Sequence, residues 1–143
     1  MEFDKEFLDK LFEQAMENPR LRQNFDLRTS PADTSQRMLN ALQPGTEGPI
    51  HRHEKTTETV ICLVGKLEEI IYEEVNGYVH EVTSYCGDVI RQKNFKEVSR
   101  QILSPAEGKF GIQIPAGAWH TINVIEPSVI FEAKDGAYRR DDR

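Results

Sequence analysis

From Gln36 onward the sequence consists of short apolar runs that alternate with turn residues, and this pattern constrains the fold more than any other feature. Runs such as ETVICLV, KLEEIIYEEV and VIFEAK have the length and composition of β-strands. Turns are predicted at Gly65-Lys66, at Asn76-Gly77 and across 126–128. Asn-Gly suits a two-residue hairpin, so the runs on either side of it should pair antiparallel. Many short strands in succession predict an antiparallel barrel or sandwich.

The N-terminal residues have a different period. In FDKEFLDKLFEQAMENP the apolar side chains recur at helical spacing, with charged residues opposite them. Asp4 is placed to cap this helix, and Asn18-Pro19 is placed to end it. The chain is therefore predicted to be mainly β, with an N-terminal α-helical extension.

The length of 143 residues suits one domain with a single core. Residues 86–105 fit neither period, and we expect an irregular excursion there. The predicted organisation is a single domain over 1–143, with a helical extension at 1–30 and a β-barrel core at 36–134.

Charge and hydropathy narrow the possible partners. The chain has 18 Lys and Arg against 24 Asp and Glu, a formal net charge of -6, which is the wrong sign for binding phosphate backbones. No apolar run approaches the roughly 18 residues of a membrane span, and the start MEFDKEF is acidic where a secretory signal would be basic. We expect a cytoplasmic protein that binds neither nucleic acid nor membrane, with a small molecule as its partner.

Histidines are few in this chain, and two of the four lie one residue apart in PGTEGPIHRHEKTTE. On an extended strand His51 and His53 face the same side, about 6.5–7 Å apart along the backbone. Glu58 would face the other side by parity, so residues 54–57 must turn or bulge to bring it back. Two imidazoles and a carboxylate held together suit a divalent cation. His120, which follows the predicted turn PAGA, is a fourth candidate ligand.

These residues resemble the two motifs of the cupin superfamily. The first, G-x5-H-x-H-x4-E-x6-G, is matched at Gly45, His51, His53, Glu58 and Gly65. The second, G-x5-P-x-G-x2-H-x3-N, is matched by Pro115, Gly117 and His120, whereas Gly108 and Asn123 each lie one residue out of place. The resemblance implies a small antiparallel, jelly-roll-like cupin β-barrel.

A narrower resemblance covers most of the chain outside 86–105. NPRLRQNFDLR, SQRMLNALQPGTEGPIHRH, PAGAWHTI and VIFEAKDGAY are similar to the WbuC family of cupin-fold metalloproteins. This resemblance implies a metal site and a link to surface-polysaccharide, especially O-antigen, biosynthesis. By position it implies metal ligands at His51, His53, Glu58 and His120. Family members commonly have an aromatic residue where this chain has Thr57.

The leading hypothesis is a metal-dependent enzyme, of isomerase, lyase or oxygenase type, acting on a small polar or anionic, carbohydrate-derived substrate. One divalent ion per chain is expected, with Fe, Mn, Zn and Ni all open. Arg37, Gln113 and Tyr138 are candidate substrate contacts. A non-catalytic ligand-binding or regulatory cupin is the alternative, and a metal-free sugar epimerase fits less well because it would not need this ligand quartet. A homodimer is also open, since cupins often dimerise.

Overall fold

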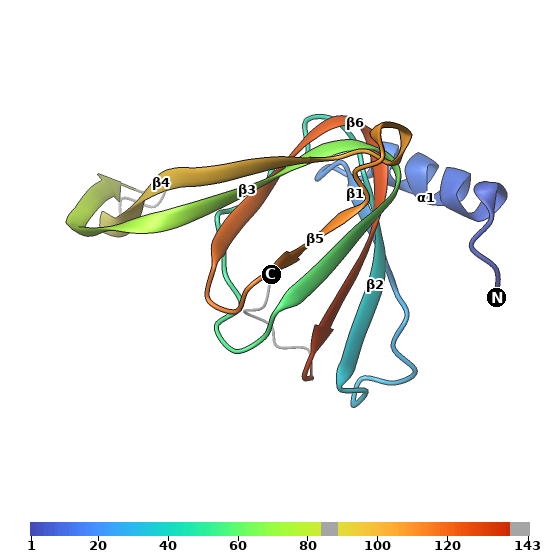
Figure 1. Cartoon of the computed structure of the whole chain (residues 1–143), viewed down its shortest axis with the longest axis horizontal. Coiled ribbons are helices and arrows are strands. Elements are labelled where there is room, and N and C mark those ends of the chain that lie inside the picture. Colours follow the sequence, from blue (N-terminus) through green and yellow to red (C-terminus); the bar gives the residue numbers. More distant parts are fainter. Residues whose placement is uncertain (84–88, 138–143) are drawn as a thin grey trace.

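The computed structural model describes residues 1–83 and 89–137, with side chains described at 1–75 and 93–137. One N-terminal helix is followed by six strands (Figure 1). The elements are α1 (Lys5–Glu17), β1 (Arg22–Asp26), β2 (Ser35–Leu42), β3 (Glu58–Thr83), β4 (Val89–Leu103), the short 3-10 helix η1 (Pro105–Glu107), β5 (Gly111–Ile114) and β6 (Trp119–Asp135). The predicted mainly β class with a helical extension is confirmed.

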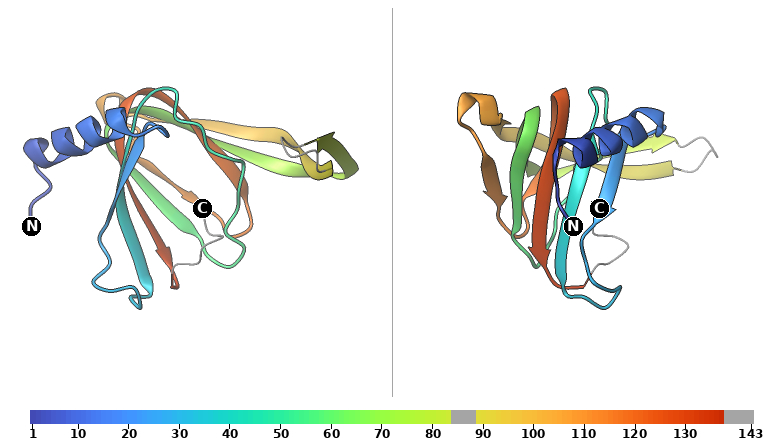
Figure 2. Two further views of the ribbon diagram at one scale, coloured as in Figure 1. Left: turned by 180° about the vertical axis from the view of Figure 1, so that it is seen from behind. Right: turned by 90° about the vertical axis from the view of Figure 1, so that its right-hand side faces the viewer.

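The strands form one antiparallel sheet in the order β1-β2-β6-β3-β4, and β5 pairs with β3 outside this path. β3 and β6 pair along most of their length, from Glu58 opposite Lys134 to Tyr72 opposite Trp119. Figure 2 shows that the sheet curves around an interior, with α1 lying against its outside. The predicted antiparallel architecture is therefore confirmed.

Two predicted turns are wrong, because the chain bends there without leaving the sheet. Gly65 lies inside β3, where the register with β6 shifts, and residues 126–128 lie inside β6. Gly65 has φ of 97°, and a Cβ on it would lie 2.2 Å from the Pro127 carbonyl oxygen. Only glycine allows the two strands to approach so closely. The turn residues thus mark a bulge, which lets long strands curve.

The predicted hairpin at Asn76-Gly77 is also wrong. β3 continues through these residues with a register shift between Glu74 and Val79, and it pairs with β4 rather than with itself. The predicted irregular excursion at 86–105 is corrected at the same time, since 89–103 form β4, while 84–88 lie outside the described residues. Beyond Tyr72, β3 pairs only with β4, and the two strands project as an arm (Figure 1). Because no sheet packs on the faces of this arm in the described part of the chain, β4 does not need the alternation of apolar and polar residues that marks a half-buried strand.

The N-terminal extension is helical as predicted, but only in part. The Asp4 carboxylate accepts a hydrogen bond from the Phe7 backbone N–H at 2.9 Å, and the helix ends before Asn18. Residues 22–26 of the predicted extension instead form β1, which pairs with β2. The ring of Phe25 packs edge-on against Phe7, with centroids 5.0 Å apart. β1 therefore belongs to the sheet and provides part of the surface on which α1 docks.

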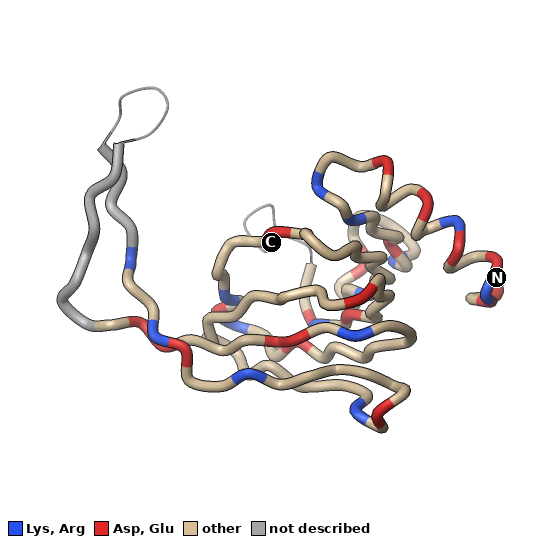
Figure 3. The backbone as a smooth tube through the Cα atoms, turned by 90° about the horizontal axis from the view of Figure 1, so that it is seen from above, with Lys and Arg blue, Asp and Glu red and all other residues tan. Residues whose placement is uncertain are grey.

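Charged residues of both signs recur along α1 (Figure 3). Lys5 pairs with Asp9 at 2.7 Å, four residues apart and largely exposed. Such surface pairs contribute little to stability. The opposite face, with Leu11 and Ala15 buried, holds the helix on the sheet. No helix among the described residues combines the length and apolarity that a membrane crossing requires.

The buried apolar residues form two clusters on opposite faces of the sheet. The outer cluster lies under α1 and consists of Leu11, Ala15, Leu39, Ala41 and Val129. The inner cluster fills one end of the interior and consists of Leu42, Val60, Cys62, Leu67, Leu103, Ile114, Val124 and Ile130. Polar side chains occupy the rest of the inner face, including His53, Glu58, Glu69 and His120, all below 9% exposed. The candidate site lies among them.

Candidate metal centre

Backbone pairing brings His51 and His120 together from distant parts of the chain. The His51 N–H donates to the His120 carbonyl at 3.0 Å, and the His120 N–H donates to the His51 carbonyl at 2.8 Å. The segment before β3 thus lies beside the start of β6 as a short bridge. Gly117 N–H donates to the His53 carbonyl at 2.8 Å, which fixes the second histidine to the turn before β6.

The three imidazole rings meet inside the curved sheet. The ring centroids of His51 and His120 are 4.3 Å apart, and His53 lies 5.2 Å and 5.5 Å from them. One ring nitrogen from each residue lies within 4.8 Å of the others. His53 and His120 are only 6% and 3% exposed. The extended arrangement predicted for His51 and His53 is what allows this convergence.

Glu58, the first residue of β3, joins the cluster. Its Oε2 lies 2.8 Å from His53 Nε2 and 3.6 Å from His120 Nε2. Residues 54–57 lie outside the strands, as the parity argument required. Glu58 is only 6% exposed, so this oxygen faces the two ring nitrogens rather than solvent. A buried carboxylate oxygen that faces ring nitrogens is suited to a cation between them.

Neighbouring carbonyls orient two of the rings. His51 Nδ1 lies 3.1 Å from the Pro49 carbonyl oxygen, and His120 Nδ1 lies 2.9 Å from that of Ala118. A carbonyl only accepts, so Nδ1 carries the proton in both rings. The lone pair of Nε2 is then available for a metal, in the usual arrangement of metal-binding histidines.

His53 is oriented differently. Lys134 Nζ lies 3.2 Å from His53 Nδ1. A lysine ammonium can only donate, so Nδ1 accepts and the ring proton lies on Nε2, the atom that faces Glu58. Binding of an ion through this Nε2 by a neutral imidazole requires the ring proton to move to Nδ1, so Lys134 must first leave that nitrogen. The three imidazoles and the Glu58 carboxylate suit a divalent ion, but the contact of Lys134 with His53 makes binding of the ion less favourable.

The surroundings shift the pKa values of the cluster. Burial and the neighbouring His120 lower the pKa of His51 to about 4, against a weaker upward effect of its bond to the Pro49 carbonyl. Burial raises the pKa of Glu58, but His120 and His53 outweigh it and hold this pKa well below its usual range. Near neutral pH the site therefore contains a neutral His51 and an ionised Glu58, the forms that bind metals.

Two further carboxyl groups face the same interior, and the sequence did not indicate them. Glu69 is 2% exposed, and burial together with the charges of Glu58 and Glu132 raises its pKa well above the usual value. Burial, followed by the charge of Glu58, does the same for Glu132. Glu132 has the same parity as His120 on β6, but the predicted turn at 126–128 interrupted that count, and the bulge at Gly65 shifts the parity of Glu69 relative to Glu58.

Of the three predicted substrate contacts, the two that the structure describes, Arg37 and Gln113, make no contact with the histidines among the interactions of the described residues. Arg37 pairs with Asp33 at 3.1 Å and donates to backbone carbonyls. Gln113 is exposed, on the side of β5 opposite the buried Ile114. Tyr138 lies outside the described residues. Their role in substrate binding remains a prediction.

The fold and the site define a cupin-like protein with a three-histidine candidate metal site. KdgF from Halomonas sp. superposes with a TM-score of 0.54 at 19% identity, over 87% of this chain and 86% of that one. A cupin 2 domain-containing protein from Halorhodospira halophila gives 0.57 at 18% identity, over 85% and 69%. An oxalate oxidase bound to the substrate analogue glycolate gives 0.57 at 12%, over 85% of this chain and 54% of its own. At these identities the likeness shows the fold alone.

Residues 3–84 match the family described as "Domain of unknown function (DUF6016)", and the chain belongs to this family. The matched part contains three of the four predicted ligands, whereas His120 lies beyond it. Comparison with curated protein sequences finds no match. The chain spans about half the length of the oxalate oxidase.

Proposed function

We propose that this protein is a metal-dependent cupin enzyme, of isomerase, lyase or oxygenase type, that acts on a small polar or anionic substrate derived from a carbohydrate. The observation that carries the proposal is the buried convergence of His51, His53 and His120 on one point, with Glu58 Oε2 2.8 Å from His53 Nε2. A structural staple is a weaker explanation, because a curved sheet with two apolar clusters already has a core.

The charges of the site support a small anionic substrate. A divalent ion held by three neutral imidazoles and one carboxylate keeps a net positive charge, and it would supply Lewis acidity or, as iron, oxygen activation. Glu69 and Glu132 keep their protons to a higher pH than ordinary carboxyl groups because their pKa values are raised, so they add less negative charge than their number suggests. Lys134 adds a positive charge at the edge of the ligand set.

The resemblance to the WbuC family supports the biological setting. It spans the segments that carry the ligands, and it points to surface-polysaccharide, especially O-antigen, metabolism as the source of the substrate. We propose the sugar acids, keto acids and sugar nucleotides of that metabolism as the first candidates.

The metal site is tested by elemental analysis of protein purified without added metal. Wild-type protein is expected to contain about one divalent ion per chain, and His120→Ala to lose most of it because one of four ligands is gone. His80→Ala is the matched control, since the sequence gives His80 no partner at ligand spacing. Equal metal content in wild type and His120→Ala would reject the assignment.

The enzymatic part is tested by turnover. Metal-loaded protein is incubated with the candidate compounds, and products are followed by mass spectrometry and NMR. Product formation that disappears in His120→Ala supports the enzyme. If a compound raises the thermal stability of the protein but no product forms, the ligand-binding alternative is favoured. In that case the projecting arm offers a surface for a partner, because Val75 and Val98 are 40% and 51% exposed there.

A further inference from the structure

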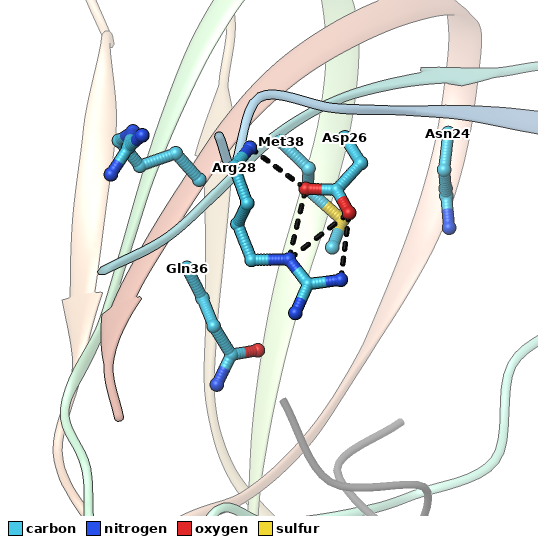
Figure 4. A pocket seen from close by; sticks show the side chains of 6 residues that line it. Asn24, Asp26, Arg28, Gln36 and Met38 are labelled. Carbon is cyan, nitrogen blue, oxygen red and sulfur yellow. Dashed lines mark hydrogen bonds and ion pairs between the residues drawn. The ribbon is translucent and has the colours of Figure 1, made fainter. Parts of the chain in front are cut away.

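A polar cavity of about 190 Å³ lies at the edge of the inner face, separate from the three histidines. At roughly 30 Å³ per water it has room for about six waters, the scale of one small molecule. Figure 4 shows its residues projecting from β1, from β2 and from the segment between them. The lining consists of Asn24, Asp26, Arg28, Gln36, Arg37 and Met38.

The charged groups of the cavity are paired with each other. Arg28 forms a forked contact with Asp26, from Nε at 3.0 Å and from a terminal nitrogen at 2.8 Å (Figure 4). Arg37 is paired with Asp33 at 3.1 Å. With both guanidinium groups matched by carboxylates, the cavity presents hydrogen-bonding groups rather than a net charge. Such a lining suits neutral polar groups better than a second carboxylate.

Gln36 offers an unused acceptor in this lining. Gln36 is only 5% exposed. Its side-chain Nε2 donates a hydrogen bond to the Gly136 carbonyl at 2.9 Å, and this bond fixes which way the amide points. Within the described part of the chain, Oε1 of Gln36 has no hydrogen-bond partner. The same is true of Oδ1 of Asn40, which lies on the same face of β2 and is 7% exposed. Buried acceptors without partners are costly, so donors are expected to reach them.

Sheet register connects this cavity to the metal centre. Gln36 lies opposite Lys134 on β6, and Lys134 lies opposite Glu58 on β3. Side chains of directly opposite residues share one face, so these three form a row on the inner surface. Two strand spacings of about 4.8 Å put Gln36 roughly 10 Å from Glu58. One molecule with a polar chain or ring can therefore contact both ends of the row.

We propose that the cavity is a subsite for hydroxyl groups, so that the substrate is a polyhydroxylated small carboxylate whose carboxylate binds at the metal centre. Gln36 Oε1 accepts a hydrogen bond from a substrate hydroxyl, and the paired Asp26 and Arg28 shape the cavity around the neighbouring carbons. This inference rests on the proposed function, since it places the carboxylate at the metal. It goes further by naming the chemical class that the site selects, a sugar acid rather than a simple carboxylic acid.

Three six-carbon probes separate hydroxyl recognition from charge recognition. Gluconate has a carboxylate and hydroxyls, hexanoate has only the carboxylate, and sorbitol has only hydroxyls. Binding of each is measured by calorimetry and by thermal unfolding, on Mn²⁺-loaded protein and on metal-stripped protein. Gluconate is expected to bind at least tenfold more tightly than either of the others to the loaded protein. Comparing hexanoate binding to loaded and to metal-stripped protein tests the metal centre. Comparing gluconate with hexanoate on the loaded protein tests the cavity. The two proposals can therefore fail independently.

Gln36→Leu removes the acceptor at similar volume. Loss of one hydrogen bond is expected to weaken gluconate binding about 3- to 10-fold, while hexanoate binding stays unchanged. Gln14→Leu, at an exposed position of α1, is the matched control and should change neither. The midpoint of unfolding of Gln36→Leu without ligand should not fall, because an unpaired buried oxygen has been removed and the exposed Gly136 carbonyl can bind water.

Asn24→Leu is a second variant, at an exposed position of the cavity rim where folding is not at risk. It should also reduce the preference for gluconate over hexanoate. Equal binding of gluconate and hexanoate by the wild type overturns the subsite, and so does a preference for gluconate that survives in both Gln36→Leu and Asn24→Leu. A preference that falls in both variants supports it.

Discussion

Glu69 is a carboxyl group enclosed by the sheet, with 2% of its surface exposed and its Oε2 without a hydrogen-bond partner among the described residues. Burial raises its pKa well above the usual value, and the charges of Glu58 and Glu132 add to the shift. A group whose pKa is raised by folding favours the folded state most below its unfolded pKa near 4.5, and this contribution is lost as pH rises. The folded protein therefore carries a pH-dependent cost near neutrality.

Glu69→Gln should remove that cost, because an amide needs no proton. The variant is expected to gain stability relative to wild type as pH rises above 4.5, by up to about 1.4 kcal/mol per pH unit until the folded pKa is reached. Metal-free protein is unfolded with urea from pH 5 to pH 8. Glu68→Gln, on the opposite face of β3, is the control. A difference between wild type and Glu69→Gln that does not change with pH would contradict the assignment.

Lys134 opposes metal binding through its contact with His53. Lys134→Met removes a cation from the edge of the site and frees His53 Nδ1, so affinity for Mn²⁺ should rise about 5- to 30-fold, the equivalent of a charged hydrogen bond of roughly 1–2 kcal/mol. Competition with a chelator measures the change. Lys96→Met, at an exposed position of β4, should leave the affinity as it is. Weaker Mn²⁺ binding by Lys134→Met would show that the ammonium supports the site.

At the scale of elements, the bulge at Gly65 decides how β3 meets β6. Lys66 N–H donates to the Ser128 hydroxyl at 2.9 Å beside it, and both strands continue past this point. Because β3 bends without ending, its first half lies near β5 and its second half near β4. The curvature that encloses the site therefore originates in this close approach.

Gly65→Ala should disrupt this approach. Its Cβ would meet the Pro127 carbonyl oxygen at 2.2 Å and the Ser128 hydroxyl at 2.4 Å, and we expect a loss above roughly 3 kcal/mol of unfolding free energy. Gly108→Ala is the matched control, because φ is also positive, at 75°, but nothing lies within 4 Å. Its cost should be only the backbone term of about 1–2 kcal/mol. Denaturant unfolding measures the free energy of unfolding of both variants. Equal losses in Gly65→Ala and Gly108→Ala would show that the close approach of the two strands does not matter for stability.

At the scale of the whole molecule, the candidate centre links three separate parts of the chain. His51 and His53 come from the segment before β3, Glu58 from β3 and His120 from β6. An ion bound to all four should stabilise the folded state, because the unfolded chain cannot hold these side chains together.

Thermal unfolding measures that link. At a free Mn²⁺ concentration 100 times the dissociation constant, the wild type should gain about 2.7 kcal/mol, with a corresponding rise in the midpoint. The gain should disappear with excess chelator and should be largely absent from His120→Ala. His80→Ala should keep it. No shift in wild-type protein at saturating Mn²⁺, Zn²⁺, Ni²⁺ and Fe²⁺ would argue against a shared site.

The sequence alone was sufficient for features that depend on local spacing. The cap at Asp4 and the helix end before Pro19 follow from the conformations that a few adjacent residues permit, and the convergence of His51 with His53 follows from the two-residue period of an extended strand. The return of Glu58 required only a turn between neighbouring positions. Position 120 was found because the turn before it has its own residue signature.

Only the tertiary structure decided which turn residues end a strand. Gly65, Asn76-Gly77 and 126–128 read as turns, yet β3 and β6 continue through them, because hydrogen bonds to distant strands outweigh the local preference. A bulge shifts the side-chain parity by one, so no count along β3 could place Glu69 inside, and the predicted turn at 126–128 broke the count from His120 to Glu132 and Lys134. Residues at the candidate centre with short-range spacing were therefore predictable, whereas those that depend on the long-range register of β3 with β6 were not.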